Sequence, residues 1–383
     1  MSDDIVYYNL TIGTDNNALN NQSLAAIIAQ NTLPIIDNPK DYYGSIVRLS
    51  IPQFEIPNFY FDVETDGNGN VPDINKGVYK FTIGWGSIST SGQINLIASN
   101  TQNVTWIQQD FTVAVPKVGI PPTQSSYYFG YSYEEIIDQW NTALSNAYSV
   151  VQAAVGAPLI VNKPPFFVYD ATTQLISLYS PQAWSEFSTS GNFLQIYFND
   201  IMEPLMTGFS YNSYLNPIKT DLFYVKSYPN STTPTNNVTI NGTNYIRLTQ
   251  QYNGFSYWNM LRNISVSTSM PVVQEGYFIG SDNNRLGQNV ILQSTLTDYL
   301  QDLDQGASSA GVGGGQFIYN ASSLWRLFCF NNSNPLYNIS ASIYFTDKNN
   351  NVWPLTLFSG QDISIKFMFI KKHLVSNLLK NKI

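Results

Sequence analysis

Charged side chains are scarce in this chain of 383 residues. Asp, Glu, Lys and Arg make up 11% of it, whereas globular proteins carry about 25%. Aromatic residues reach 14%, and the net charge is −8. A negative chain is a poor candidate for a general nucleic-acid binder. Because interfaces are enriched in aromatic residues and depleted of Lys and Glu, this composition favours a surface that neighbouring chains cover.

The chain has one cysteine, Cys329, and one histidine, His373. One residue of each cannot supply a tetrahedral zinc site, and no disulfide can form within the chain. Catalysis by a Ser–His or Cys–His pair would require His373, which stands in the C-terminal tail. Cys329 lies in an apolar run and is expected to be a buried core thiol. We therefore predict that the protein is not an enzyme and holds no cofactor.

Long apolar runs are missing too. No stretch approaches the ~18 residues of a membrane-spanning helix. The first ten residues, MSDDIVYYNL, lack the basic and apolar regions of a signal peptide. Together with the single cysteine, these features predict folding in a reducing compartment.

What the chain does have is β-strand patterning, most clearly in its last third. Three runs alternate apolar and polar residues, namely Ile339–Phe345, Val352–Phe358 and Ile363–Phe369. Turns rich in Asn, Asp, Ser and Gly join them, including an expected hairpin turn at Asp347–Asn351. Alternation with such turns is typical of a β-sandwich or barrel built from hairpins.

Strand-like runs also fill the earlier part of the chain, with few helices between them. One helix is predicted over Ser132–Val155, because Ser132 and Glu135 form a capping-box pair and apolar residues follow at helical spacing. Shorter helices are expected at Leu24–Gln30 and Thr295–Leu303. The other expected strands include Ile46–Ile51, Val78–Trp85, Trp106–Val115, Phe166–Tyr169, Leu175–Tyr179, Phe193–Phe198, Leu222–Tyr228, Tyr245–Gln250 and Ile264–Thr268.

The strand pattern resets near residue 215, so that each half is a string of strands interrupted by one short helix. This organisation predicts a mainly β protein of two tandem β-sandwiches. The expected domains are residues 1–215 with an N-terminal arm, residues 216–372, and a basic C-terminal tail at residues 373–383.

One segment has the spacing of a metal loop. Oxygen-bearing side chains occupy the ligand positions of a twelve-residue calcium loop, with Gly67 at the turn position. Asp stands where the bidentate Glu would be, however, and a strand precedes the loop, so an acidic surface turn is the alternative. The weak candidate ligands are Asp62, Glu64, Asp66, Asn68, Asn70 and Asp73.

Lysines gather at the C-terminal end without acidic residues among them. A solvated end is one interpretation, and a surface that contacts packaged genome or a membrane is the other. The residues concerned are Lys366, Lys371, Lys372, Lys380 and Lys382.

Several phrases resemble a known family. They include NPKDYYGSIVRLSIP, LQIYFNDIMEPLMTGF and SSLWRLFCFNNSNPLYNISASIYFTDKNNNVWPLTLFSGQDISIKFMFIKK. These phrases are similar to capsid proteins of the double jelly-roll lineage of adenoviruses and tectiviruses, in particular those of polinton-like viruses and virophages. The resemblance implies two tandem jelly-roll sandwiches, one short helix inserted in each, and no catalytic residues.

The resemblance also implies a function and partners. The chain would form homo-trimers that act as pseudo-hexagonal capsomers of an icosahedral double-stranded DNA virus. These capsomers would then assemble into a capsid lattice with other capsid proteins, with no small-molecule substrate. The expected location is the virion, with assembly in the host cytoplasm or nucleus.

Other functions stay open at this point. The chain is short for that virus group, so a pentameric vertex (penton) protein with a single jelly roll and an inserted domain is one alternative. The many Trp and Tyr residues leave a receptor- or carbohydrate-binding β-sandwich as another. A glycoside hydrolase would need two carboxylates facing each other across a cleft, and the sequence selects no such pair.

Overall fold

The computed structural model shows a mainly β protein, as predicted, that divides into two compact units. Unit 1 consists of Met1–Pro57 together with Met260–Ile383, and unit 2 of Asn58–Asn259. The structure describes residues 4–13, 22–52, 55–88, 94–111, 113–120, 125–156, 163–181, 193–209, 211–216, 219–225, 237–254, 260–268, 270–273, 289–295, 316–320, 327–358 and 360–375.

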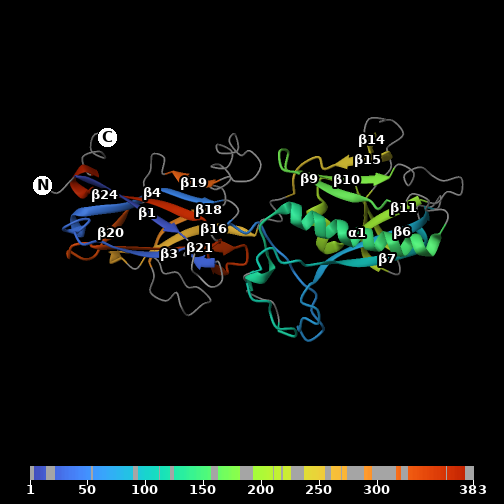
Figure 1. The fold of residues 1–383 in the computed structure, drawn as a ribbon, viewed down its shortest axis with the longest axis horizontal. Coiled ribbons are helices and arrows are strands. Elements are labelled where there is room, and N and C mark those ends of the chain that lie inside the picture. The colour runs from blue at the N-terminus through green and yellow to red at the C-terminus, as the bar shows by residue number, and fades with distance from the viewer. Residues whose placement is uncertain are drawn as a thin grey trace. The chain divides into compact units, whose positions relative to one another are not determined.

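Unit 1 contains two principal antiparallel sheets (Figure 1). The first has the order β1-β24-β4-β20-β17, with β19 also paired to β4. The second has the order β18-β16-β21-β22, with β3 also paired to β21. The strands are β1 (Ile5–Gly13), β2 (Gln22–Leu24), β3 (Ala26–Gln30), β4 (Tyr42–Pro52), β16 (Leu261–Thr268), β17 (Val272–Val273), β18 (Asn289–Thr295), β19 (Gln316–Asn320), β20 (Phe328–Phe330), β21 (Asn338–Asp347), β22 (Val352–Pro354), β23 (Thr356–Phe358) and β24 (Asp362–Lys371).

The strand order of unit 1 is that of one jelly roll. The first strand of the chain, β1, lies beside the last, β24, with Ile5 opposite Ile370 and Gly13 opposite Asp362. Figure 1 shows these two strands side by side, in dark blue and red. Chain neighbours are placed in different sheets, as when β3 leads to β4 or β4 to β16. This interleaving of two sheets is the double Greek key of a jelly roll.

Alternating side chains fill the space between these sheets. Leu10, Leu49, Ile365 and Phe367 are fully or almost fully buried. Buried and exposed residues alternate along β1 and the first half of β24, which is the pattern of a sandwich with one face in the core, while most of β4 and the later half of β24 are buried. The three alternating runs of the last third are confirmed as β21, β22 with β23, and β24.

Unit 2 combines two sheets with one long helix. Its larger sheet has the order β12-β13-β11-β6-β7 and its smaller sheet the order β14-β15-β10-β9, while β5 pairs with β8. The bounds are β5 (Phe59–Tyr60), β6 (Lys76–Ile88), β7 (Ile94–Thr105), β8 (Phe129–Gly130), α1 (Tyr133–Val155), β9 (Phe166–Asp170), β10 (Leu175–Pro181), β11 (Phe193–Asn199), β12 (Tyr211–Asn216), β13 (Lys219–Val225), β14 (Asn237–Ile240) and β15 (Thr243–Thr249). Short 3-10 helices lie at Pro39–Asp41, Ser126–Tyr128 and Asp200–Met206.

Helix α1 is the element that the sequence predicted best. Its apolar face packs into the unit 2 core, where the Trp140 ring lies 5.6 Å from both the Phe81 and Phe167 rings. Gly156 ends the helix with a φ of 70°, a conformation that favours glycine. The capping box is not formed, because the Ser132 hydroxyl donates to the Glu134 carboxylate at 2.7 Å instead of accepting a backbone N–H.

The domain boundary and two local predictions need correction. Residue 215 lies inside unit 2, and strands from both ends of the chain build unit 1 together. Leu24–Gln30 is not helical, because pairing with β23 and β21 makes it the strands β2 and β3. The described residues of the segment Trp106–Val115 form an irregular loop, not a strand. The predicted helix Thr295–Leu303 lies outside the described residues, apart from Thr295 at the end of β18.

Candidate functional site

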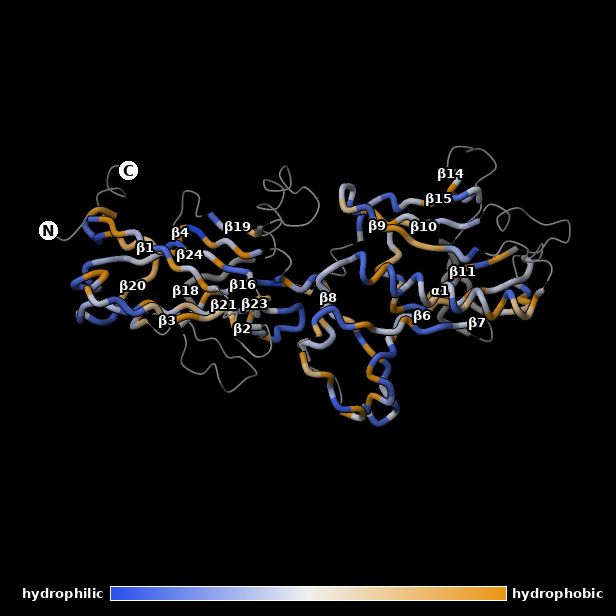
Figure 2. The backbone as a smooth tube through the Cα atoms, in the orientation of Figure 1, coloured by the Kyte–Doolittle hydropathy of each residue, from blue (hydrophilic) through white to orange (hydrophobic). Residues whose placement is uncertain are grey.

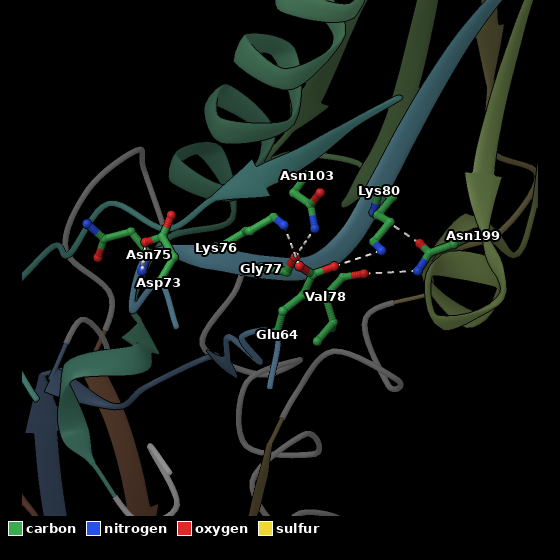
Figure 3. A network of polar contacts seen from close by, with 9 residues as sticks. All are labelled: Glu64, Asp73, Asn75, Lys76, Gly77, Val78, Lys80, Asn103 and Asn199. Atoms are coloured by element: carbon green, nitrogen blue, oxygen red, sulfur yellow. Dashed lines mark hydrogen bonds and ion pairs between the residues drawn. The ribbon is translucent and has the colours of Figure 1, made fainter. Parts of the chain in front are cut away.

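Glu64, one of the candidate calcium ligands, is engaged by two lysines (Figure 3). Its two carboxylate oxygens lie 2.7 Å from Lys76 Nζ and 2.7 Å from Lys80 Nζ. Partial burial raises the pKa of Glu64, but the hydrogen bonds from Lys76 and Lys80 outweigh it and lower the pKa to about 2. Both lysines come from the start of β6, so this ion-pair cluster fastens the loop to the larger sheet of unit 2.

Asp66, a second candidate ligand, closes its own turn. Its Oδ1 accepts the backbone N–H groups of Asn68 and Asn70, both at 2.8 Å, and its Oδ2 accepts from Asn70 Nδ2 at 3.1 Å. These hydrogen bonds lower the pKa of Asp66. Gly69 completes the turn with a φ of 80°.

The hairpin turn predicted at Asp347–Asn351 repeats this arrangement. Asp347 Oδ1 accepts the N–H groups of Asn349 and Asn351 at 2.8 Å, and Oδ2 accepts from Asn351 Nδ2 at 2.9 Å. Asn350 takes the place of Gly69, with a φ of 65°. The calcium-like spacing therefore coincides with an Asp-x-Asn-x-Asn turn that the chain uses twice.

The remaining candidate ligands do not converge. Asp73 Oδ1 accepts the N–H of Asn75 at 3.0 Å, and Asp62 is exposed, its carbonyl accepting from Val78. Among the residues that the structure describes, no group of three or more His, Cys, Asp or Glu side chains could hold a metal ion. Of the predicted set, only Asp66, Asn68 and Asn70 come together, and they do so in a closed turn.

Three lysines of the predicted basic tail lie on the body of unit 1. Lys366 Nζ stands 4.6 Å from the centre of the Tyr7 ring, and Lys372 Nζ 5.3 Å from that of Tyr43. Lys371 Nζ lies 3.1 Å from Asp4 Oδ1, and this hydrogen bond raises the pKa of Lys371. Lys380 and Lys382 lie outside the described residues, so contact of the tail with genome or membrane stays a prediction.

Cys329 and three of the tryptophans occupy structural positions. Cys329 is only half-buried, because its neighbours Phe328 and Phe330 point into unit 1 and leave it on the other side of β20. Trp85, Trp106 and Trp140 are buried in the core of unit 2. No helix within the described ranges is long and apolar enough to span a membrane.

Residues 107–111 and 113–120, called the apolar loop below, form an exposed surface that the predicted strand did not anticipate. The hydropathy colouring of the backbone shows apolar and polar residues intermixed along both units (Figure 2). Most large apolar side chains of the apolar loop are exposed, whereas Gln108 and Asp110 are 8% and 5% exposed and Val113 packs against the core of unit 2. A strand in this segment would bury its apolar side chains and expose its polar ones, and the structure mostly shows the reverse. The exposed residues are Ile107 (51%), Phe111 (84%), Val115 (55%), Val118 (63%) and Ile120 (55%).

Comparisons with known proteins point to virophage capsids. The uncharacterized protein V18 of Sputnik virophage is 34% identical over 165 residues, which is 43% of this chain and 91% of that protein. The structural protein V19 of Sputnik virophage is 27% identical over 139 residues, which is 36% of this chain and 61% of that protein. The chain thus spans less than two thirds of V19.

Solved structures agree over nearly the whole chain. A chain from the 3.5 Å cryo-EM structure of Sputnik virophage matches with a TM-score of 0.66 and 25% identity, covering 97% of this chain and 99% of that one. The crystal structure of the mavirus penton protein shares the fold, with a TM-score of 0.56 and 12% identity, over 96% of this chain and 100% of that one.

The Sputnik minor capsid protein V18/19 family model matches residues 6–371. The chain therefore belongs to this family, and it is a structural capsid protein of virophage type and not an enzyme.

Proposed function

We propose that this chain forms the pentameric vertex (penton) of an icosahedral virophage-type capsid. The observation that carries this proposal is the architecture: one jelly roll, built from both ends of the chain, with unit 2 inserted between β4 and β16. A double jelly-roll trimer gives a pseudo-hexagonal capsomer because each chain contributes two sandwiches. One sandwich per chain suits a fivefold ring.

The fold shared with the mavirus penton protein supports the same assignment. Assembly with copies of itself and with other capsid proteins follows from family membership. The number of copies, the contacts with other capsid proteins and the site of assembly in the host belong to the proposal.

Native mass spectrometry and negative-stain microscopy of the purified full chain test the proposal. We expect rings of five chains, and about five copies at each vertex of purified particles. Trimers in solution, or a copy number in the virion that matches the faces instead of the vertices, would overturn it.

A further inference from the structure

We propose that the apolar loop is an assembly contact that binds a second copy of this chain, at the surface formed by β1 and β24. The inference rests on the proposed function, since the second copy would be the neighbour in the same vertex ring. The inference goes beyond the proposed function because it names both surfaces that form the contact. A ring requires two different surfaces of one chain to meet, because its contacts are heterologous.

Hydrogen bonds on its buried side fix the backbone of the apolar loop, although its exposed side is apolar. Gln108 Nε2 donates to the Val113 carbonyl at 3.1 Å, and Gln139 Nε2 of α1 donates to the Ile107 carbonyl at 3.2 Å. The Gln109 side chain accepts the N–H groups of Tyr131 and Ser132 at the start of α1.

Further anchors come from two other segments. The Trp106 indole donates to the Tyr127 carbonyl at 3.1 Å, and Gly119 N–H donates to the Val71 carbonyl at 2.9 Å. Amide side chains therefore fix the backbone from the inner side, where Asp110 is buried too, while Phe111 and Val118 stay in solvent. An apolar side that is ordered before binding pays little entropy when a partner covers it.

Charge indicates which class of partner fits. Lys117 is the only basic residue of the apolar loop, and the adjoining loop, joined through Val71, carries the exposed carboxylates of Asp66 and Asp73. Anionic lipid and nucleic acid are both repelled by such an acidic flank. The surface instead suits a protein partner that is apolar with basic residues beside it.

The chain carries a surface of that kind on unit 1. Ile5 and Tyr7 of β1 are 41% and 54% exposed, although both are large and apolar. Lys366 lies over the Tyr7 ring and supplies the basic residue beside them. Among the described strands β1 pairs with β24 alone and is therefore an edge strand of its sheet.

Photo-crosslinking tests both sides of the contact. Phe111 is replaced by p-benzoylphenylalanine in the full chain, and ¹⁴N- and ¹⁵N-labelled protein are mixed before irradiation. Mixed-isotope cross-linked peptides that join position 111 to residues 5–9 or 366–372 are the expected result. The same amino acid at Val150, an exposed apolar position on α1, serves as the control and should give no such peptides. Cross-links confined to one chain, or to another surface, would overturn the inference.

A second measurement separates this inference from the proposed function. The double variant Phe111→Ser/Val118→Ser should raise the dissociation constant of self-association by roughly 30-fold or more, as measured by sedimentation velocity. The control variant Val150→Ser should leave it unchanged, and all three proteins should melt at similar temperatures because the changed side chains are exposed. Rings that form equally well in the double variant would refute the contact and leave the vertex proposal standing.

Two further outcomes are decisive. If the wild-type chain forms another oligomer that the double variant weakens, with cross-links to β1 and β24, the contact holds and the vertex proposal fails. Flotation of the wild type with anionic vesicles, lost in the double variant, would overturn the contact in favour of a membrane.

Discussion

At the scale of single residues, two aspartates decide the shape of two turns. Asp66 and Asp347 each accept two backbone N–H groups and one Asn side chain. In both turns the residue before the last Asn has a positive φ, and it is Gly69 in one and Asn350 in the other. The sequence alone could reveal the spacing of oxygen-bearing residues. It could not reveal that their oxygens turn inward to backbone groups, because that depends on dihedral angles.

The pair Asn350→Gly and Asn350→Ala isolates the cost of this dihedral angle. Both variants lose the hydrogen bond from Arg262 to the Asn350 side chain, and they differ in tolerance of a positive φ. We expect the Gly variant to be more stable than the Ala variant by about 1 kcal/mol in free energy of unfolding. Urea titration of both proteins measures the difference, and equal midpoints would contradict the assigned φ.

The ion pairs of Glu64 make the free energy of unfolding depend on pH. Its pKa in the folded chain is about 2, below the ordinary value of 4.5, because Lys76 and Lys80 favour the charged form. Its stabilisation is therefore fully present above about pH 4.5 and is lost as the pH falls toward 2. Because the pair is partly exposed and screened, we expect about 1 kcal/mol.

The variant Glu64→Gln tests the direction of this pH dependence. It should melt below the wild type at pH 7, and the two melting temperatures should draw together as the pH falls from 4.5 to about 2. Asp138→Asn, which removes an exposed negative charge elsewhere in unit 2, controls for net charge. A gap that stays constant with pH would show that the ion pairs do not stabilise the fold.

At the scale of elements, strand pairing decides where a side chain can fit. Gly44 of β4 lies opposite Phe328 of β20, and a Cβ at Gly44 would stand 2.3 Å from the Phe328 ring. Gly13 of β1, in the same sheet, has nothing within 4 Å of such a Cβ. We expect Gly44→Ala to destabilise unit 1 by about 1–3 kcal/mol, since overpacking forces the ring aside.

Gly13→Ala is the matched control and should change the unfolding midpoint little. Combining Gly44→Ala with Phe328→Leu should recover part of the loss, because the smaller side chain makes room for the methyl group. If Gly44→Ala proves as harmless as Gly13→Ala, the close approach of Phe328 is refuted.

Elements were predictable where local pattern and tertiary packing agree. Helix α1 and the strands β10, β11, β21 and β24 lie where the sequence placed them. The strand predicted at Trp106–Val115 was wrong because the residues that are buried there include Gln108 and Asp110 instead of Phe111 and Val115. Residues 24–30 resemble a helix in composition, and only their pairing with β21 and β23 makes them strands.

At the scale of the whole molecule, the insertion of unit 2 is what the sequence could not predict. Alternation shows that β1 and β24 are strands, but it does not show that they pair across 349 to 365 positions of the chain, from Gly13 with Asp362 to Ile5 with Ile370. Strand pairing over such a separation depends on the completed core and not on local spacing. A string of strands with a break near residue 215 therefore suggested two tandem sandwiches, whereas the contacts define a jelly roll interrupted by a second unit.

Fragments distinguish these two organisations directly. Residues 58–259 form unit 2, a continuous stretch whose buried cluster contains Trp85, Trp106 and Trp140. We expect this fragment to fold alone, with a cooperative melting transition and blue-shifted tryptophan fluorescence.

The fragment 1–215 removes β24 and β21 from β1 and β3, and it also separates β12 from β13. We expect it to lack a sharp transition, because exposed sheet edges and half a core replace the jelly roll. A cooperative transition of 1–215 together with an unfolded 58–259 would restore the tandem organisation and remove the architectural basis of the vertex proposal.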